Sequence, residues 1–520
     1  LFDMRRWLVV LAFLCLPIAA LAGLTSRDST YDNACAITGT CTGGGGTASP
    51  IMLEHIASST NPPGNGITGH AFKIQVDTVP TSTVIVVAVS YVHGKTYTMS
   101  DTLGLTWTQT GCTADAGTGN NVSSIWWAAT NSSTSGTDTI TMNPGTTATQ
   151  PFQFDLTLWQ NISTTSPVNG KLCTANITPT ASPNYLVDPG SFTPTNNDAN
   201  GGNVIYNYSA LCAGGNETQN PTSFTAGTSF TLLNADNWGG AAFNAGGTNG
   251  FPEAAQYYVQ TTAAAIDAKL ETTGDTTDCY NSSTVALAVA NNSQTAPSTL
   301  HVAKIIHESW VTFNSPATFT VNLPTVGNLR VATFTWAGGC PGAGTGCLGS
   351  MSSSDGCSWT LLGSTGGTAA IGYAQNCSPC PNCTVSVVFT GTQTGMPQGS
   401  FRLYDIQNAL ASSYQNSTFG FASTCNSTWT NMPGSFTPSG ASSGLVIHVL
   451  GNGDGPVPTL TSPSGAFNDL WEFTGITDSD VADNSDETDH EFYSGSPSLS
   501  WSGTKTHTAD QCYYGAAAFN

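Results

Sequence analysis

Cysteine is the residue type in this sequence whose number and spacing are best suited to covalent chemistry. One of the 15 cysteines, Cys15, lies in an N-terminal apolar run, which leaves 14. An even number of cysteines in a chain with an export signal is typical of disulfide bonding, because oxidising compartments allow these bonds to persist. Pairing all 14 gives seven disulfides among Cys35, Cys41, Cys112, Cys173, Cys212, Cys279, Cys340, Cys347, Cys357, Cys377, Cys380, Cys383, Cys425 and Cys512.

Three of these cysteines, Cys377, Cys380 and Cys383, form the pattern C-x2-C-x2-C. Some iron–sulfur proteins begin a cluster loop with this spacing. The fourth cysteine and the proline that usually complete such a loop are missing here. Because an exported chain passes into an oxidising compartment, the sequence favours disulfides at these positions over an iron–sulfur cluster.

Acidic residues are concentrated in one segment, 478–491. Carboxylate oxygens at this density are ligands that Ca²⁺ accepts, which makes Asp478, Asp480, Asp483 and Asp486 the candidate calcium ligands. The segment lacks the glycine that the EF-hand loop needs at its sixth position. A solvated acidic loop is therefore the favoured interpretation, with calcium as the alternative and no other cofactor predicted.

Exposed aromatic side chains in a β-sandwich can stack on sugar rings. Trp107 and Trp359 recur at equivalent turns, which indicates a shared core or corner role. The candidate carbohydrate-binding residues are those without an aromatic equivalent, namely Trp126, Trp238 and Trp429.

Searches for catalytic patterns favour structural interpretations. The sequence 440–444 fits G-x-S-x-G, but it leads from a loop into a strand, whereas a nucleophile elbow lies between a strand and a helix. His307-Glu308 lacks the second histidine of a zinc-protease helix. His55 and His301 are interpreted as equivalent structural residues at the first strand of each copy. The sequence thus predicts no catalytic residue, and an enzyme is the less favoured outcome.

The elements that hold these residues recur in two copies. The block 189–194 (PGSFTP) is repeated at 433–438, and six further blocks recur in the same order. In one of them FDLTLWQN, 154–161, answers to FRLYDIQN, 401–408, so that Asp155 aligns with Arg402. A period of roughly 245 residues is that of a whole domain and not of one stacked element.

Each copy has the alternation of strand-forming runs and turn residues that is typical of an all-β domain. Runs of β-branched and aromatic residues are separated by clusters of Gly, Asn, Ser, Thr and Pro. The run 84–89 is apolar throughout, as in a strand covered on both faces. The segment before Trp107, D-x-x-G, predicts a hairpin turn, and only 262–271 has helical periodicity. The predicted fold is two tandem β-sandwiches of jelly-roll or immunoglobulin-like type.

The repeat suggests how the cysteines pair. Cys173 and Cys425 each precede the PGSFTP block, and Cys279 and Cys512 each precede the last strand. The predicted equivalent bridges are therefore Cys173–Cys279 and Cys425–Cys512. Cys112–Cys212 follows by elimination, and Cys340–Cys347 is predicted as a local loop.

The N-terminal region outside the repeats is divided into a signal and a leader. Residues 1–22 have the basic start, short apolar run and small-x-small site of a secretory signal peptide. Residues 23–50, with Cys35, Cys41 and four consecutive glycines, predict a disulfide-looped flexible leader. Repeat 1 is assigned to 51–290, the linker to 291–298 and repeat 2 to 299–520.

The composition limits the partners. Lys and Arg number 11 against 32 Asp and Glu, a net charge of −21 that would repel a phosphate backbone and excludes nucleic acid. No second apolar stretch approaches about 18 residues, so membrane insertion is not predicted. Only 8% of residues are charged, against roughly 25% in an ordinary domain, so the surface is mostly neutral and polar.

The pattern Asp-x-x-Gly-x-x-Trp at 101–107, followed by the pair Trp126-Trp127 and the strand that ends at Asn161, resembles β-sandwich repeats of large secreted bacterial surface proteins. The resemblance implies an extracellular location and a role in adhesion or structure, and it carries no catalytic residues. The expected function is a non-enzymatic structural or adhesive protein. Its expected partners are copies of itself or other cell-surface components, with which it would form a filament or surface layer. The alternative is a secreted carbohydrate-binding protein or polysaccharide-active enzyme with glycan ligands.

Overall fold

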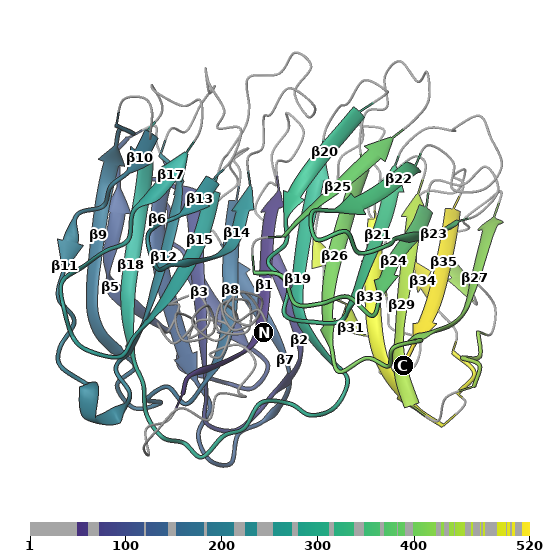
Figure 1. Cartoon of the computed structure of the whole chain (residues 1–520), viewed down its shortest axis with the longest axis horizontal. Helices are drawn as coiled ribbons and strands as arrows, with labels where there is room; N and C mark the ends of the chain where they lie inside the picture. Colours follow the sequence, from purple (N-terminus) through teal and green to yellow (C-terminus); the bar gives the residue numbers. More distant parts are fainter. Residues whose placement is uncertain are drawn as a thin grey trace, which may run out of the picture.

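The computed structural model describes residues 49–60, 72–118, 121–143, 152–180, 185–212, 224–236, 253–272, 279–310, 317–336, 348–363, 369–381, 383–389, 399–422, 428–430, 436–440, 443–452, 459–460, 468–469, 472–473, 486–495, 497–499, 502–504 and 512–520. The signal peptide and nearly all of the leader predicted from the sequence lie outside this part. Within it the chain is all-β, as predicted (Figure 1). The described part contains no helix that is long and apolar enough to cross a membrane.

A ten-stranded sheet runs through the centre of the molecule and belongs to both repeats (Figure 1). Read outward from the middle, repeat 1 contributes β1 (Ile51–Thr60), β8 (Phe152–Gln160), β3 (Thr83–Val92), β6 (Asn121–Ala129) and β5 (Thr108–Asp115). Repeat 2 contributes β19 (His301–Trp310), β26 (Gly399–Gln407), β21 (Leu329–Trp336), β24 (Ala369–Gln375) and β23 (Thr360–Gly363) in the corresponding order. The two copies therefore have the same topology.

The two halves of the central sheet are joined by the first strand of each repeat. β1 and β19 are parallel neighbours, with pairs that run from His55 and Lys304 to Ser59 and Glu308. All other strand pairs of this sheet are antiparallel. The repeats are consequently joined side by side through backbone hydrogen bonds of one sheet.

A five-stranded sheet from the second half of each repeat covers the central sheet. In repeat 1 it consists of β14 (Thr231–Asp236), β15 (Glu253–Gln260), β12 (Asn203–Leu211), β18 (Tyr280–Ala288) and β9 (Val168–Ile177). In repeat 2 its equivalent is β31 (Asn468–Asp469), β33 (Asp486–Ser494), β29 (Ser443–Asn452), β35 (Cys512–Phe519) and β27 (Tyr414–Ala422). The strand order is the same in both, which supports the repeat that the sequence predicts.

Smaller sheets complete the layers. β2 (Phe72–Val79), β7 (Gly136–Asn143) and β4 (Thr98–Asp101) form one, which β32 (Glu472–Phe473) of repeat 2 extends. β20 (Ala317–Asn322), β25 (Thr384–Phe389) and β22 (Leu348–Ser353) are the equivalent strands of repeat 2. Minor sheets contain β10 (Tyr185–Val187), β17 (Leu270–Thr272) and β13 (Phe224–Ala226); β11 (Ser191–Phe192) and β16 (Ile266–Asp267); and β28 (Thr428–Thr430), β34 (Ser502–Thr504) and β30 (Thr459–Leu460).

Strand β3 illustrates why the central sheet is buried on both faces. Val84, Val86 and Ala88 pack into the core under the five-stranded sheet of repeat 1. The alternate residues 85, 87 and 89 pack into a second core on the opposite face, which continues into repeat 2 beneath β29 and β35. Side chains of a strand alternate between faces, so a strand with two covered faces must be apolar throughout. The prediction for this run is confirmed.

The position of the covering sheets shows how the repeats are related. The core beneath the five-stranded sheet of repeat 2 is continuous with the core beneath the small sheet of repeat 1. The large sheets thus cover opposite faces of the central sheet. The two repeats are therefore related by a half-turn about an axis parallel to the strands. Such a rotation exchanges the two faces of the central sheet but keeps the strand direction, which is why β1 and β19 are parallel.

Two local predictions are wrong. Strands β4 and β5 on either side of the D-x-x-G segment belong to different sheets, so this segment is a crossover between layers and not a hairpin. The segment 262–271 contains β16 and part of β17 and no helix. Its Ala268 and Leu270 are buried while Lys269 between them lies outward, so the period is that of a strand.

Candidate functional sites

A cluster of buried polar side chains lies beside the junction of the two repeats. His55 of β1 places Nε2 2.6 Å from Oδ2 of Asp155 on β8. The hydroxyl of Tyr206 on β12 donates to the other oxygen, Oδ1, at 2.6 Å. All three side chains are fully buried. Asp155 therefore bridges the central sheet and the five-stranded sheet that covers it.

Repeat 2 contributes a cation to the same face of the central sheet. Lys304 of β19 pairs in register with His55, and its Nζ donates to the carbonyl oxygen of Leu233 on β14 at 3.0 Å. Burial lowers the pKa of Lys304 to about 8, although the charges of Asp405 and Asp155 act to raise it. This hydrogen bond connects a side chain of repeat 2 to the backbone of repeat 1.

The protonation of the cluster suits a structural role. Burial lowers the pKa of His55, and the neighbouring Asp155 only partly offsets this effect, so the imidazole is neutral at neutral pH. Burial and the Asp155 charge raise the pKa of Tyr206 well above its usual value, which keeps its hydroxyl protonated as a donor. None of these groups reaches solvent. A substrate could not reach them, so the cluster is a fixed polar contact between layers and repeats.

The register corrects the sequence alignment of the two histidines. Glu54 pairs with Leu158 and Lys304 pairs with Asp405 at the same bulge of the two copies, so Glu54 is the equivalent of Lys304. His55 then corresponds to Ile305 and not to His301. His301 is partly exposed, and its Nε2 contacts the carbonyl oxygen of Leu53.

A second polar cluster, in repeat 2, is centred on Arg330 of β21. The guanidinium is fully buried and donates to both carboxylate oxygens of Asp355, at 3.0 and 2.6 Å. It also donates to Thr325 Oγ1 and to the carbonyl oxygen of Ser378, each at 3.0 Å. The Arg330 hydrogen bonds hold the pKa of Asp355 far below its usual range, so the Asp355 carboxyl group is ionised at neutral pH.

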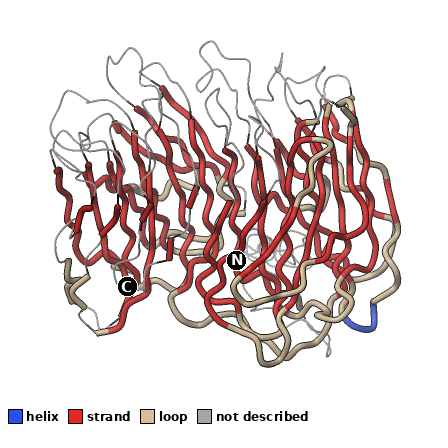
Figure 2. The backbone as a smooth tube through the Cα atoms, turned by 180° about the vertical axis from the view of Figure 1, so that it is seen from behind, coloured by secondary structure: helices blue, strands red, loops and turns tan. Residues whose placement is uncertain are grey.

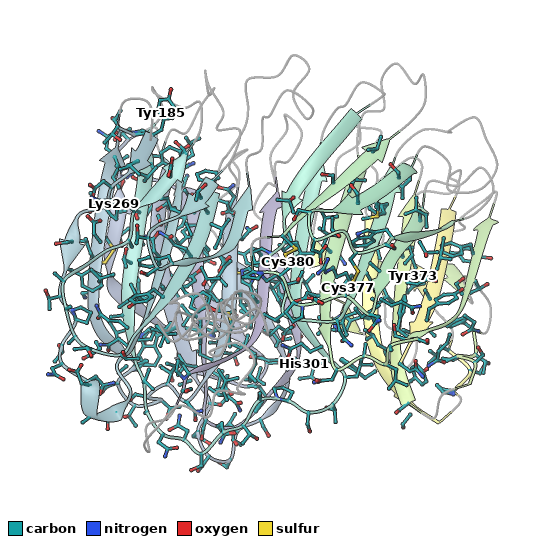
Figure 3. All side chains as sticks on the ribbon, viewed as in Figure 1. Tyr185, Lys269, His301, Tyr373, Cys377 and Cys380 are labelled. Carbon is teal, nitrogen blue, oxygen red and sulfur yellow. A yellow bond between two sulfur atoms is a disulfide. The ribbon has the colours of Figure 1, made fainter. Side chains whose placement is uncertain are left out.

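Two disulfides lie in the loop beside Arg330. Cys357 is bonded to Cys377, and Cys380 is bonded to Cys383. Figure 3 labels Cys377 and Cys380 in this part of repeat 2. The C-x2-C-x2-C cysteines thus form disulfides, which is the interpretation that the sequence favours. Asp355, Cys380 and Cys383 have oxygen and sulfur atoms within 4.8 Å of one another.

The cysteines of repeat 1 pair differently from the prediction. The bonds are Cys112–Cys173 and Cys212–Cys279, so the predicted Cys173–Cys279 and Cys112–Cys212 bridges are wrong. Cys112–Cys173 joins β5 to β9, the edge strands of two stacked sheets. Cys212 and Cys279 flank the antiparallel neighbours β12 and β18 at the Leu211–Tyr280 pair. Cys35, Cys41, Cys340, Cys347 and Cys425 lie outside the described residues, as does any bond to Cys512.

Disulfide mapping tests this connectivity. A non-reducing digest with a protease of broad specificity is expected to yield linked peptides that contain Cys112 with Cys173 and Cys212 with Cys279. Their Cα separations of 5.8 and 5.3 Å lie within the usual disulfide range. A peptide that links Cys173 to Cys279 would contradict the structure.

Trp126, the described carbohydrate candidate, is held in a packed aromatic group. Its ring lies 5.8 Å from that of Tyr97, which stacks on Tyr91 at 5.0 Å. The indole Nε1 donates to Ser124 Oγ at 3.1 Å, and the ring is only partly exposed. Trp238 lies outside the described residues, as does the side chain of Trp429 on β28. Trp126 is thus packed against Tyr97 on one side and remains partly exposed.

The other candidates are placed as follows. Asp478, Asp480 and Asp483 lie outside the described residues, and Asp486 begins β33 with a side chain that is not described, so the calcium hypothesis stays a prediction. Gly440 is in a turn with φ of +89° and the chain continues into β29, not into a helix. His307 and Glu308 lie on β19, and their side chains are not described.

The sequence interpretation missed Lys304, Tyr206 and Arg330. The signal for the two cations was a basic residue inside an otherwise apolar strand, as in 302–306 and 329–332, in a chain with only 11 Lys and Arg. Such a residue is buried at a cost unless it is paired.

Comparison with family models, with curated proteins and with solved structures gives no match.

Proposed function

We propose that this chain is a non-enzymatic structural or adhesive protein of the cell exterior, in which the two repeats act as one rigid slab. The observation that supports this most is the ten-stranded central sheet common to both repeats. A sheet that continues across the junction leaves no hinge between repeats, whereas many enzymes close a cleft between two moving units. Figure 2 shows the strands of both halves side by side.

The buried polar residues agree with this role. In the described part, the His55–Asp155–Tyr206 group is sealed between layers, and Arg330 is committed to Asp355, Thr325 and Ser378. These side chains hold the sheets together. Catalysis would instead need groups that a substrate can reach.

The secreted location rests on the sequence and on the bonding of the cysteines. Residues 1–22 have the pattern of a signal peptide. Four disulfides are present in the described part, which is the bonding state of an oxidising compartment. Only 8% of the residues are charged, so most of the surface is polar and uncharged, which suits assembly with copies of the chain or with other surface components. The net charge of −21 disfavours binding of nucleic acid.

Fractionation of native material tests the proposal. The protein is expected with the cell-surface fraction, where negative-stain microscopy would show ordered arrays or filaments. A strictly monomeric species free in the surrounding medium would contradict it. Strong binding on a glycan array would instead support the carbohydrate-binding alternative, for which the packing of Trp126 offers no support.

A further inference from the structure

The Cys380–Cys383 disulfide closes a loop of the form C-P-x-C, with two residues between the cysteines. The two sulfur-bearing residues differ in accessibility: Cys380 is partly exposed, whereas Cys383 is 1% exposed. Thiol–disulfide exchange requires one sulfur that an external thiolate can reach, and a partner that leaves and later closes the bond again. We propose that Cys380–Cys383 is a redox-active pair that exchanges with external thiols, with Cys380 as the attacked sulfur.

The backbone holds both cysteines in place independently of the sulfur–sulfur bond. The amide of Cys380 donates a hydrogen bond to the carbonyl oxygen of Thr325 at 2.9 Å. The amide of Thr325 donates to the carbonyl oxygen of Cys380 at 2.8 Å. Leu323 donates to the carbonyl oxygen of Cys383 at 2.8 Å. The hydroxyl oxygen of Thr325 in turn accepts a hydrogen bond from the guanidinium of Arg330. The reduced thiols would thus stay close together, and the high effective concentration favours closure of the bond.

The short loop also separates reduction from unfolding. The stabilisation from a disulfide grows with the number of residues that it encloses. Cys380 and Cys383 are 3 residues apart, whereas the other described bridges span 20, 61 and 67 residues. Opening the short bridge removes the least restraint, so the fold is expected to survive it.

The exchange balances as two displacements. An external thiolate attacks Cys380 Sγ, a mixed disulfide forms, and the Cys380–Cys383 bond breaks with Cys383 leaving as a thiolate that takes up a proton. A second external thiolate attacks the external sulfur of the mixed disulfide and releases Cys380 as a thiolate. Two thiols are oxidised to one disulfide, and the protein gains two electrons and two protons. The reverse sequence oxidises the dithiol at the expense of an external disulfide.

The inference is independent of the structural role proposed above, because exchange at this loop leaves the central sheet untouched. Its first test treats the folded, full chain with reduced glutathione at neutral pH, followed by alkylation and mass spectrometry. Cys380 and Cys383 are expected to be labelled at least about tenfold faster than Cys357 and Cys377, because opening the 3-residue bridge disturbs the fold less than opening the 20-residue one. The Cys357–Cys377 bridge is a matched control, since it too joins a partly exposed cysteine to a buried one. Equal rates, or labelling only together with loss of the native circular dichroism spectrum, would overturn the proposal.

A matched pair of variants tests which sulfur reacts. In Cys383→Ser the free Cys380 is expected to take up one glutathione from oxidised glutathione, since it is accessible. In Cys380→Ser the buried Cys383 is expected to react at least about tenfold more slowly. Equal reactivity of the two variants, with both folded as judged by tryptophan fluorescence, would contradict the assignment of Cys380.

Discussion

Replacing Asp155 with alanine is expected to lower the free energy of unfolding by about 3–5 kcal/mol. The carboxylate accepts hydrogen bonds from His55 and Tyr206, and all three side chains are fully buried. Its removal leaves two buried polar groups without this acceptor and leaves Lys304 near a site that has lost its negative charge. Denaturant unfolding followed by tryptophan fluorescence measures the change.

The same repeat offers a matched control. His93 and Asp115 form a histidine–carboxylate pair with a separation of 2.7 Å, but their side chains are 32% and 39% exposed. Exposed pairs contribute little because water solvates both partners when the pair is broken. Asp115→Ala is therefore expected to cost less than about 1 kcal/mol. Similar losses in the two variants would show that Asp155 does not join the layers.

A proline at Ile305 is expected to destabilise the protein by more than about 3 kcal/mol and to uncouple the repeats. Ile305 is fully buried in β19, which has hydrogen-bonded neighbours on both sides, Ile56 of β1 and Tyr404 of β26. Proline removes a donor from this ladder and cannot be accommodated in a central strand. Calorimetry is expected to resolve separate transitions for the two repeats in this variant.

Thr108→Pro provides the comparison. Thr108 is exposed and is the first residue of β5, the edge strand of the same sheet, where proline is tolerated. A much smaller loss and a single transition are expected. If Ile305→Pro unfolds in one transition like Thr108→Pro, the β1–β19 pairing is not what couples the repeats.

Much of the fold follows from local features of the sequence. The repeat, the all-β class and the twice-covered strand at 84–89 depend on residue type and period, which neighbouring residues determine. The junction between the two repeats cannot be predicted from these local features. The pairing of β1 with β19 brings together residues about 250 positions apart, and alternation of side chains does not specify which strand will be the neighbour.

The cysteine pairing shows the same limit. Equivalent positions in two repeats predicted equivalent bridges, but Cys173 lies on the outer strand β9, next to β5 of the sheet below, and so meets Cys112. Only the stacking of the two sheets makes these residues neighbours. The cluster at the junction is a further example. Asp155 aligns with Arg402, so comparison of the repeats does not reveal its role, which depends on His55 and Tyr206 of repeat 1.

Differential scanning calorimetry of the full chain tests the central claim that the two repeats form one body through the shared sheet. We expect one transition that contains both repeats, with a calorimetric enthalpy equal to the van't Hoff enthalpy. Two separable transitions, each with about half of the total enthalpy, would mean that the repeats unfold independently and would contradict the claim.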